Sequence, residues 1–206
     1  RPVTKQFALG GNASGYGSST SPGFGVAWTQ AVDDPSDARP AISVNYTSKD
    51  GTDSSLGLND EDARSFLLTK LEYGSPKWQI SAAMANKKSQ AGVKEVDDDG
   101  NDVYYTNGYD GYFHSALAKG ATGDLTAYAL RGYWKPDTTG SIPEVQVGYD
   151  FASYDDPAAG QAEDTSGWMI GLGWSDLFID GNRGGIAYGS AQAASSVKSG
   201  GDTTDD

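Results

Sequence analysis

The stretch from Gly167 to Gly189, GWMIGLGWSDLFIDGNRGGIAYG, restricts the fold of this chain more than any other. Its first half alternates with a period of two, which is the side-chain period of a β-strand and not of a helix. One face of this strand carries Trp168, Ile170, Leu172 and Trp174. The turn residues Asp180–Asn182 lead into a second, weaker strand at residues 185–191. The stretch therefore predicts a β-hairpin with one bulky and one nearly bare face.

The same alternation recurs along the chain and predicts ten antiparallel strands. They cover residues 5–12, 24–29, 42–47, 67–73, 78–84, 112–119, 127–134, 145–151, 168–175 and 185–191. Short connections follow Tyr73, Lys119 and Trp134, and longer polar connections surround them. Short turns at one end and long loops at the other are typical of outer-membrane β-barrels. Strict alternation of short and long connections would, however, make the connection after Trp134 long. Residues 86–110 are expected to form a polar loop.

Composition limits what the chain can bury and bind. Hydrophobic residues make up only 37% of the 206 residues, which is low for a packed core and fits either a wall around water or a loop-rich secreted protein. The net charge of −13 argues against nucleic acid as a partner. The chain has no cysteine and no run of about 18 apolar residues that would form a transmembrane helix. Arg1-Pro2 resembles a cut end, so we expect that a leader has been removed.

The face opposite the bulky residues favours a membrane barrel over a soluble sandwich. In a soluble sandwich this face meets water and is rich in Lys, Glu and Thr. Here it is dominated by Gly, Ala, Ser and Thr, and its acids within the predicted strands are Glu72 and Asp150. We predict an all-β fold, with an antiparallel transmembrane β-barrel segment at residues 1–192 and a polar acidic tail at residues 193–206. The alternative is a soluble or cell-surface β-sandwich that binds carbohydrate through exposed aromatics.

The barrel interpretation assigns a role to each face. The small-residue face would line a water-filled pore, where charges set ion preference. Its candidate lining residues are Lys70, Glu72, Arg131, Gln146 and Asp150. The bulky face would meet the lipid bilayer, with aromatics at the two membrane interfaces. Its candidate lipid-facing aromatics are Trp28, Tyr46, Tyr149, Trp168 and Trp174.

Catalysis finds little support in the residues. The one histidine, His114, falls on a strand with two mixed faces, and a structural or pore-facing role fits it better than a catalytic one. A glycosidase needs two facing carboxylates, and the sequence does not place Glu72 and Asp150 near each other. The acidic run Asp97–Asp102 lacks the spacing and closing Glu of an EF-hand, so we read it as a solvated loop and leave calcium binding open. We expect no enzyme activity and no cofactor, and we assign no residue as a metal ligand.

The stretch GWMIGLGWSDLFIDGNRGGIAYG resembles a strand-turn-strand of cyanobacterial outer-membrane porins of the carbohydrate-selective porin family, in the iron-uptake porin branch. The stretches EVQVGYDFASYD and PGFGVAWTQA also resemble strands of that family. The resemblance implies passive diffusion of small hydrophilic solutes or inorganic ions through a trimeric channel in the outer membrane of a Gram-negative-type cell. The solute, the ion selectivity and the pore size stay open.

The chain departs from the family pattern in two respects. The family implies a barrel of about 16 strands, within the size range of outer-membrane barrels, and ten strands are too few. The family also implies an N-terminal surface-layer-homology domain, and none precedes Lys5. We therefore expect an internal segment of a larger porin barrel, whose first and last strands need partners from further sequence or from another chain.

Overall fold

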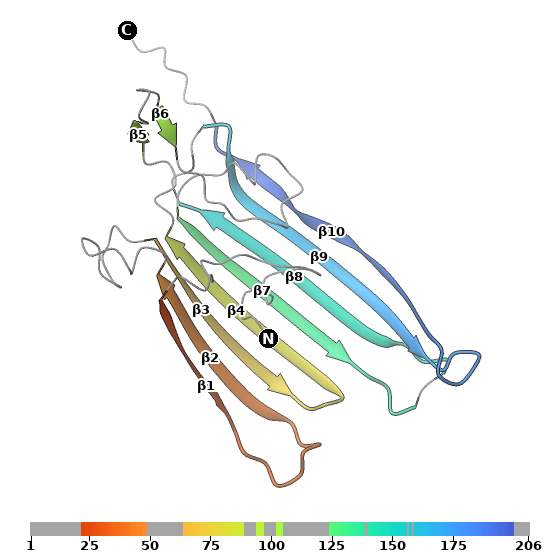
Figure 1. Cartoon of the computed structure of the whole chain (residues 1–206). Helices are drawn as coiled ribbons and strands as arrows, with labels where there is room; N and C mark the ends of the chain where they lie inside the picture. Colours follow the sequence, from red (N-terminus) through yellow and green to blue (C-terminus); the bar gives the residue numbers. More distant parts are fainter. Residues whose placement is uncertain are drawn as a thin grey trace.

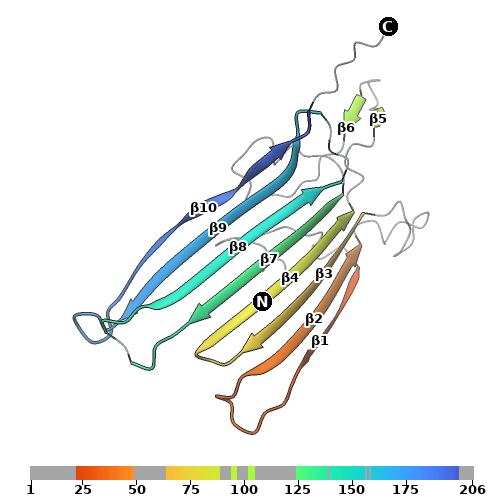
Figure 2. The same cartoon turned by 180° about the vertical axis from the view of Figure 1, so that it is seen from behind.

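The computed structural model describes residues 22–48, 64–88, 94–96, 102–104, 124–138, 140–155, 157 and 159–199. Eight strands form one continuous antiparallel sheet, seen from opposite sides in Figures 1 and 2. They are β1 (Gly23–Thr29), β2 (Arg39–Ser48), β3 (Ser65–Gly74), β4 (Trp78–Lys88), β7 (Leu125–Trp134), β8 (Glu144–Tyr154), β9 (Ala162–Ser175) and β10 (Arg183–Val197). Two short strands, β5 (Lys94–Val96) and β6 (Asp102–Tyr104), pair with each other beyond one end of the sheet (Figure 1). The described residues are thus all-β and antiparallel, and they include no helix that could cross a membrane.

The sheet is a meander in the order β1-β2-β3-β4-β7-β8-β9-β10. The connections at residues 30–38, 75–77, 135–143 and 176–182 all lie at one end of the sheet, which we call the turn end. Strands β2, β4 and β8 end, and strands β3, β7 and β9 begin, at the opposite end, which we call the loop end. Because β4 pairs directly with β7, the turns after Tyr73 and Trp134 fall at the same end. The irregular alternation expected from the sequence therefore disappears.

Eight of the ten predicted strands are confirmed, and the other two, at residues 5–12 and 112–119, lie outside the described residues. Two other predictions were wrong. The predicted polar loop at residues 86–110 contains the β5–β6 pair. The predicted boundary before a strandless tail falls inside β10, which continues to Val197 and pairs with the extended β9. Register shifts beyond Ser190 interrupt the alternation there, which explains why a period-two search ended the strand too early.

Acids are more frequent in the strands than the sequence suggested. Besides Glu72 and Asp150, the sheet contains Glu144 at the start of β8 and both Glu163 and Asp164 near the start of β9. Asp164 accepts hydrogen bonds from two serine hydroxyls at 2.6 and 2.8 Å. These three acids lie at strand ends, so the central part of each strand keeps the predicted charge pattern.

Local hydrogen bonds hold the connections at the turn end. Between β3 and β4, the Ser75 N–H donates to the carbonyl of Trp78 at 2.7 Å. Between β9 and β10, Gly181 adopts a left-handed backbone with φ of 84°, which favours glycine. Between β1 and β2, the N–H and the hydroxyl of Ser36 both donate to the Asp34 carboxylate, and these bonds, the backbone one first, lower the pKa of Asp34. The predicted short connection after Tyr73 and the predicted turn at residues 180–182 are confirmed.

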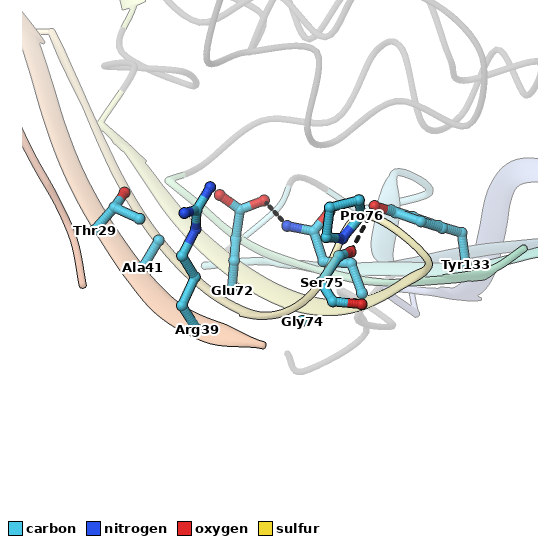
Figure 3. Close-up of a pocket in the computed structure, with 9 residues that line it drawn as sticks. Thr29, Arg39, Ala41, Glu72, Gly74, Ser75, Pro76 and Tyr133 are labelled. Atoms are coloured by element: carbon cyan, nitrogen blue, oxygen red, sulfur yellow. Dashed lines mark hydrogen bonds between the residues drawn. The ribbon is translucent and has the colours of Figure 1, made fainter. Parts of the chain in front are cut away.

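The strand register sorts the side chains into two continuous faces, because partners opposite each other in an antiparallel pair share a face. The bulky face carries all five tryptophans of the chain: Trp28, Trp78, Trp134, Trp168 and Trp174. The small-residue face lies on the side toward which the sheet bends (Figure 3).

The small-residue face changes character along its length. Toward the loop end it carries a buried apolar cluster of Phe66, Leu68, Ala83, Ala85, Leu125, Ala127, Ala129, Ala152 and Tyr154. Toward the turn end it is polar and charged. The two halves meet in the middle of the sheet, and most of the charged side chains of this face lie in the turn-end half.

Candidate functional site

Five neighbouring strands bring charged and polar side chains together on the small-residue face. All five predicted lining residues, Lys70, Glu72, Arg131, Gln146 and Asp150, lie on this face, within three adjacent rungs of the sheet. The same rungs add three side chains that the sequence did not single out: Arg39, Gln79 and Tyr133. We call these residues the charge belt.

On β3, the belt contains an ion pair between neighbours on the same face. The Lys70 ammonium contacts the Glu72 carboxylate, and both side chains are largely shielded from solvent. The Gln79 amide of β4 also donates to Glu72, at 2.9 Å. Glu72 is therefore neutralised and held in place from two strands.

A second ion pair joins β7 and β8. The Arg131 guanidinium contacts both carboxylate oxygens of Asp150, with an Nη2–Oδ2 distance of 2.7 Å. Arg131 also donates to the carbonyl of Leu130 at 2.8 Å. The Asp150 side chain is only 3% exposed. Such a bidentate contact fixes the geometry of both side chains, and each charge is compensated by the other.

The two strand acids do not face each other. Glu72 and Asp150 lie on β3 and β8, and β4 and β7 separate those strands. Three strand spacings of about 4.8 Å exceed the separation that paired glycosidase carboxylates need. Each acid instead has its own cation.

A depression of about 300 Å³ opens at the turn end of the charge belt (Figure 3). It is lined by Thr29, Arg39, Ala41, Glu72, Gly74, Ser75, Pro76, Gln79 and Tyr133. Figure 3 shows the Arg39 and Glu72 side chains extending from the same side of the sheet. The Arg39 guanidinium has no hydrogen bond or ion pair with any residue in the described part of the chain. The Tyr133 hydroxyl closes the opposite side by donating to the Ser75 carbonyl at 3.2 Å.

The bulky face carries a solvent-exposed apolar band with aromatic residues at both limits. Toward the turn end the band is limited by Trp28, Tyr73, Trp78, Trp134 and Trp174. Toward the loop end it is limited by Phe24, Tyr46, Tyr128, Phe151 and Trp168. The central strands β2, β3, β4, β7 and β8 have 10 or 11 residues. This is about the length that a tilted strand needs to cross a hydrocarbon core.

The apolar band runs obliquely across the strands. The rung that begins at Trp28 continues through Ile42, Leu71, Ala82, Leu130 and Tyr149 to Trp168. On β1 this rung is the turn-end limit of the band, whereas on β9 it is the loop-end limit. Strands tilted against a flat apolar layer produce such a displacement, and tilted strands are what a closed barrel requires.

The predicted lipid-facing aromatics all lie on the bulky face. Trp28, Tyr149 and Trp168 are 54%, 44% and 41% exposed. Tyr46 and Trp174 are half-buried, Tyr46 beside the ring of Phe24 with centroids 5.6 Å apart. The Trp174 indole N–H donates to the Ser141 carbonyl at 3.2 Å. An indole with its ring on an apolar surface and its N–H on a polar atom suits a membrane interface.

Comparisons with protein-family models, curated proteins and solved structures found no match to this chain. Within the described ranges, no group of three His, Asp or Glu side chains is placed to hold a metal ion. The acidic run Asp97–Asp102 and His114 were singled out in the sequence, but His114 and most of that run lie outside those ranges.

The sequence missed Arg39 because the predicted strand began only at residue 42, after an acidic segment at residues 31–40 that contains two prolines. In the structure β2 begins at Arg39, and Pro40 sits within the strand, where its missing N–H is tolerated near an end. Ala41 and Ser43 lie on the small-residue face, and Arg39 precedes Ala41 by two residues. Continuing the period-two alternation to residue 39 would therefore have placed Arg39 on that face.

Proposed function

We propose that this chain forms part of the wall of a water-filled channel in an outer membrane, through which small hydrophilic solutes or ions diffuse passively. The bulky face contacts lipid, and the small-residue face lines the water. The charge belt is then the charged part of the lining, and the residues that act on a passing solute are those of the belt. The proposal involves no chemical step, no enzyme activity and no cofactor.

The observation that carries this proposal is the exposed, oblique apolar band on a single-layer sheet. In a β-sandwich the bulky face packs against a second sheet. Here Phe24, Val26, Ile80 and Tyr188 are exposed on that face. The exposed aromatics of the same face also include Trp28, Tyr73, Tyr128, Trp134, Tyr149 and Trp168. A soluble protein rarely leaves so large an apolar area uncovered, whereas lipid covers it at no cost.

Closure of the wall is the second element of the proposal. Among the described strands, β1 and β10 each have a neighbour on one side only. In a bilayer each unpaired backbone group costs several kcal/mol, so an open edge is not tolerated. We propose that the two edges join further strands to complete an antiparallel barrel of about 16 strands, the size range of porins. These strands come from further sequence or from other chains.

The resemblance noted from the sequence adds the biological setting to this proposal. The segment GWMIGLGWSDLFIDGNRGGIAYG, which is the end of β9, its turn and the start of β10, supports membership of the carbohydrate-selective porins of cyanobacteria. We propose accordingly a homotrimer in the outer membrane of a Gram-negative-type cell.

Tryptophan quenching tests the proposal directly, because all five tryptophans lie on one face. The protein should be reconstituted in vesicles and its emission measured with brominated lipid and, separately, with aqueous acrylamide. Brominated lipid should quench most of the emission. Quenching by acrylamide alone would contradict the channel wall and favour the soluble carbohydrate-binding sheet. Conductance across a planar bilayer then tests whether the wall surrounds a pore.

A further inference from the structure

The charge belt is not electrically balanced. Lys70 neutralises Glu72, and Arg131 neutralises Asp150. Arg39 is the one charged residue of the belt that has no partner among the described residues. The belt therefore carries one uncompensated positive charge, although the chain as a whole carries −13.

The uncompensated guanidinium lines a space that a solute can enter. The depression measures about 300 Å³ and is also lined by Thr29 and Ser75. Since a water molecule's share of liquid volume is about 30 Å³, the depression has room for a small oxyanion with part of its hydration shell. Glu72 lines the same space, but its carboxylate is engaged by Lys70 and Gln79.

We propose that the depression at Arg39 is a weak binding site for small oxyanions, such as sulfate or the carboxylate of an organic acid. The inference rests on the proposed function, because it names a solute class that the channel wall favours. A guanidinium presents a planar fork of donors that matches two oxygens of an oxyanion, which an ammonium does not. The site thus selects for shape as well as for charge.

Nearby acids keep the affinity low. Asp33, Asp34 and Asp37 lie in the β1–β2 turn, close in sequence to Arg39, and all three are exposed. At physiological ionic strength charges are screened over about 8 Å, so these acids weaken the attraction without cancelling it. Weak binding suits passive diffusion, because a solute that binds tightly does not leave.

The test follows the side-chain Nε–Hε resonance of Arg39 by NMR in detergent micelles while sodium sulfate is added. The wild-type resonance should shift and saturate. Arg39→Gln should weaken sulfate binding about tenfold or more, measured by calorimetry, and Arg39→Lys should weaken it several-fold because the charge remains but the fork is lost. Arg183→Gln is the matched control: Arg183 lies on the same face, near the same end, but on β10 and outside the depression. The affinity of the Arg183→Gln variant for sulfate should stay within twofold of wild type.

A linear, non-saturating shift would overturn the site, and so would equal losses in Arg39→Gln and Arg183→Gln. The Arg39→Lys variant keeps the test valid where Arg39→Gln does not fold. Binding and conductance are measured separately, so the two proposals can fail independently. Sulfate binding without conductance would refute the channel and leave the site, whereas conductance without sulfate binding would refute the site alone.

Discussion

Placing one arginine on either face of β8 distinguishes a membrane wall from a soluble sheet. Val147 and Gln146 are sequence neighbours, both are exposed, and they lie on the bulky face and the small-residue face respectively. Val147→Arg and Gln146→Arg add the same charge at nearly the same place along the strand. Any difference between them therefore reports what each face contacts.

The structure sets the expected size of that difference. Val147 is 46% exposed and lies between Gly132 of β7 and Ile170 of β9, with Val145 and Tyr149 next along its own strand on the same face. None of these neighbours offers a counterion. In lipid an arginine there should cost about 2–4 kcal/mol, which is about 30-fold to 700-fold in the unfolding equilibrium. In water the same change is a surface substitution worth about 0.5 kcal/mol or less.

The assay is equilibrium unfolding by urea in vesicles of a short-chain phosphatidylcholine, followed by tryptophan emission. We expect Val147→Arg to lower the free energy of unfolding by the amount above and Gln146→Arg to change it by less than about 0.5 kcal/mol. Equal effects at the two positions would refute the assignment of the bulky face to lipid. A larger effect at Gln146 would show that the two faces are exchanged.

Three further pairs of substitutions, each a test and its control, examine individual features. Asp150→Asn leaves Arg131 without its counterion in a shielded position and should lower the free energy of unfolding by about 3–5 kcal/mol in the same assay. Asp137→Asn, in the exposed pair with Lys77, should lower it by about 1 kcal/mol or less. Equal losses in the two variants would contradict the importance of shielding. Gly181→Ala should cost about 1–2 kcal/mol because of the left-handed backbone there, and Gly184→Ala, which has open space for a methyl group and no positive φ, should cost little. Lys70→Gln should shift the reversal potential in a salt gradient toward cation selectivity by freeing Glu72, and Lys77→Gln in the exposed turn should shift it less; no difference would mean that Lys70 does not line the path.

The alternation of bulky and small residues was enough to predict the strands of the described sheet and the face of each candidate lining residue and lipid-facing aromatic. It succeeded because a period of two directly encodes which face a side chain occupies. On β9, for example, Trp168 to Trp174 were placed correctly without any knowledge of neighbouring strands. The prediction failed where the backbone departs from that period. The bulges beyond Ser190 concealed the last part of β10, and a short ribbon such as β5–β6 offers too few residues to show alternation.

Pairwise chemistry was not predictable in the same way. The alternation predicted that Arg131 and Asp150 lie on the same kind of face, but their contact depends on β7 and β8 being adjacent with a particular register. Likewise, Gln79 reaches Glu72 only because β3 and β4 form a tight hairpin. The depression at Arg39 requires four separate pieces of the chain: the end of β1, the start of β2, the β3–β4 hairpin around its turn and the end of β7. Sequence periodicity contains no information about such encounters.

The meander also determines how a wall of this kind can change over evolutionary time. Each hairpin, for example β3 with β4, is bonded to the rest of the sheet along two seams only, to β2 and to β7. If that hairpin were deleted, β2 and β7 would still run antiparallel and could pair, and a duplicated hairpin would fit in the same way. Barrel diameter grows roughly linearly with strand number. A barrel of this kind can therefore gain or lose two strands at a time without reversing the direction of any remaining strand. Each inherited gain or loss of a hairpin changes the barrel diameter by one fixed increment.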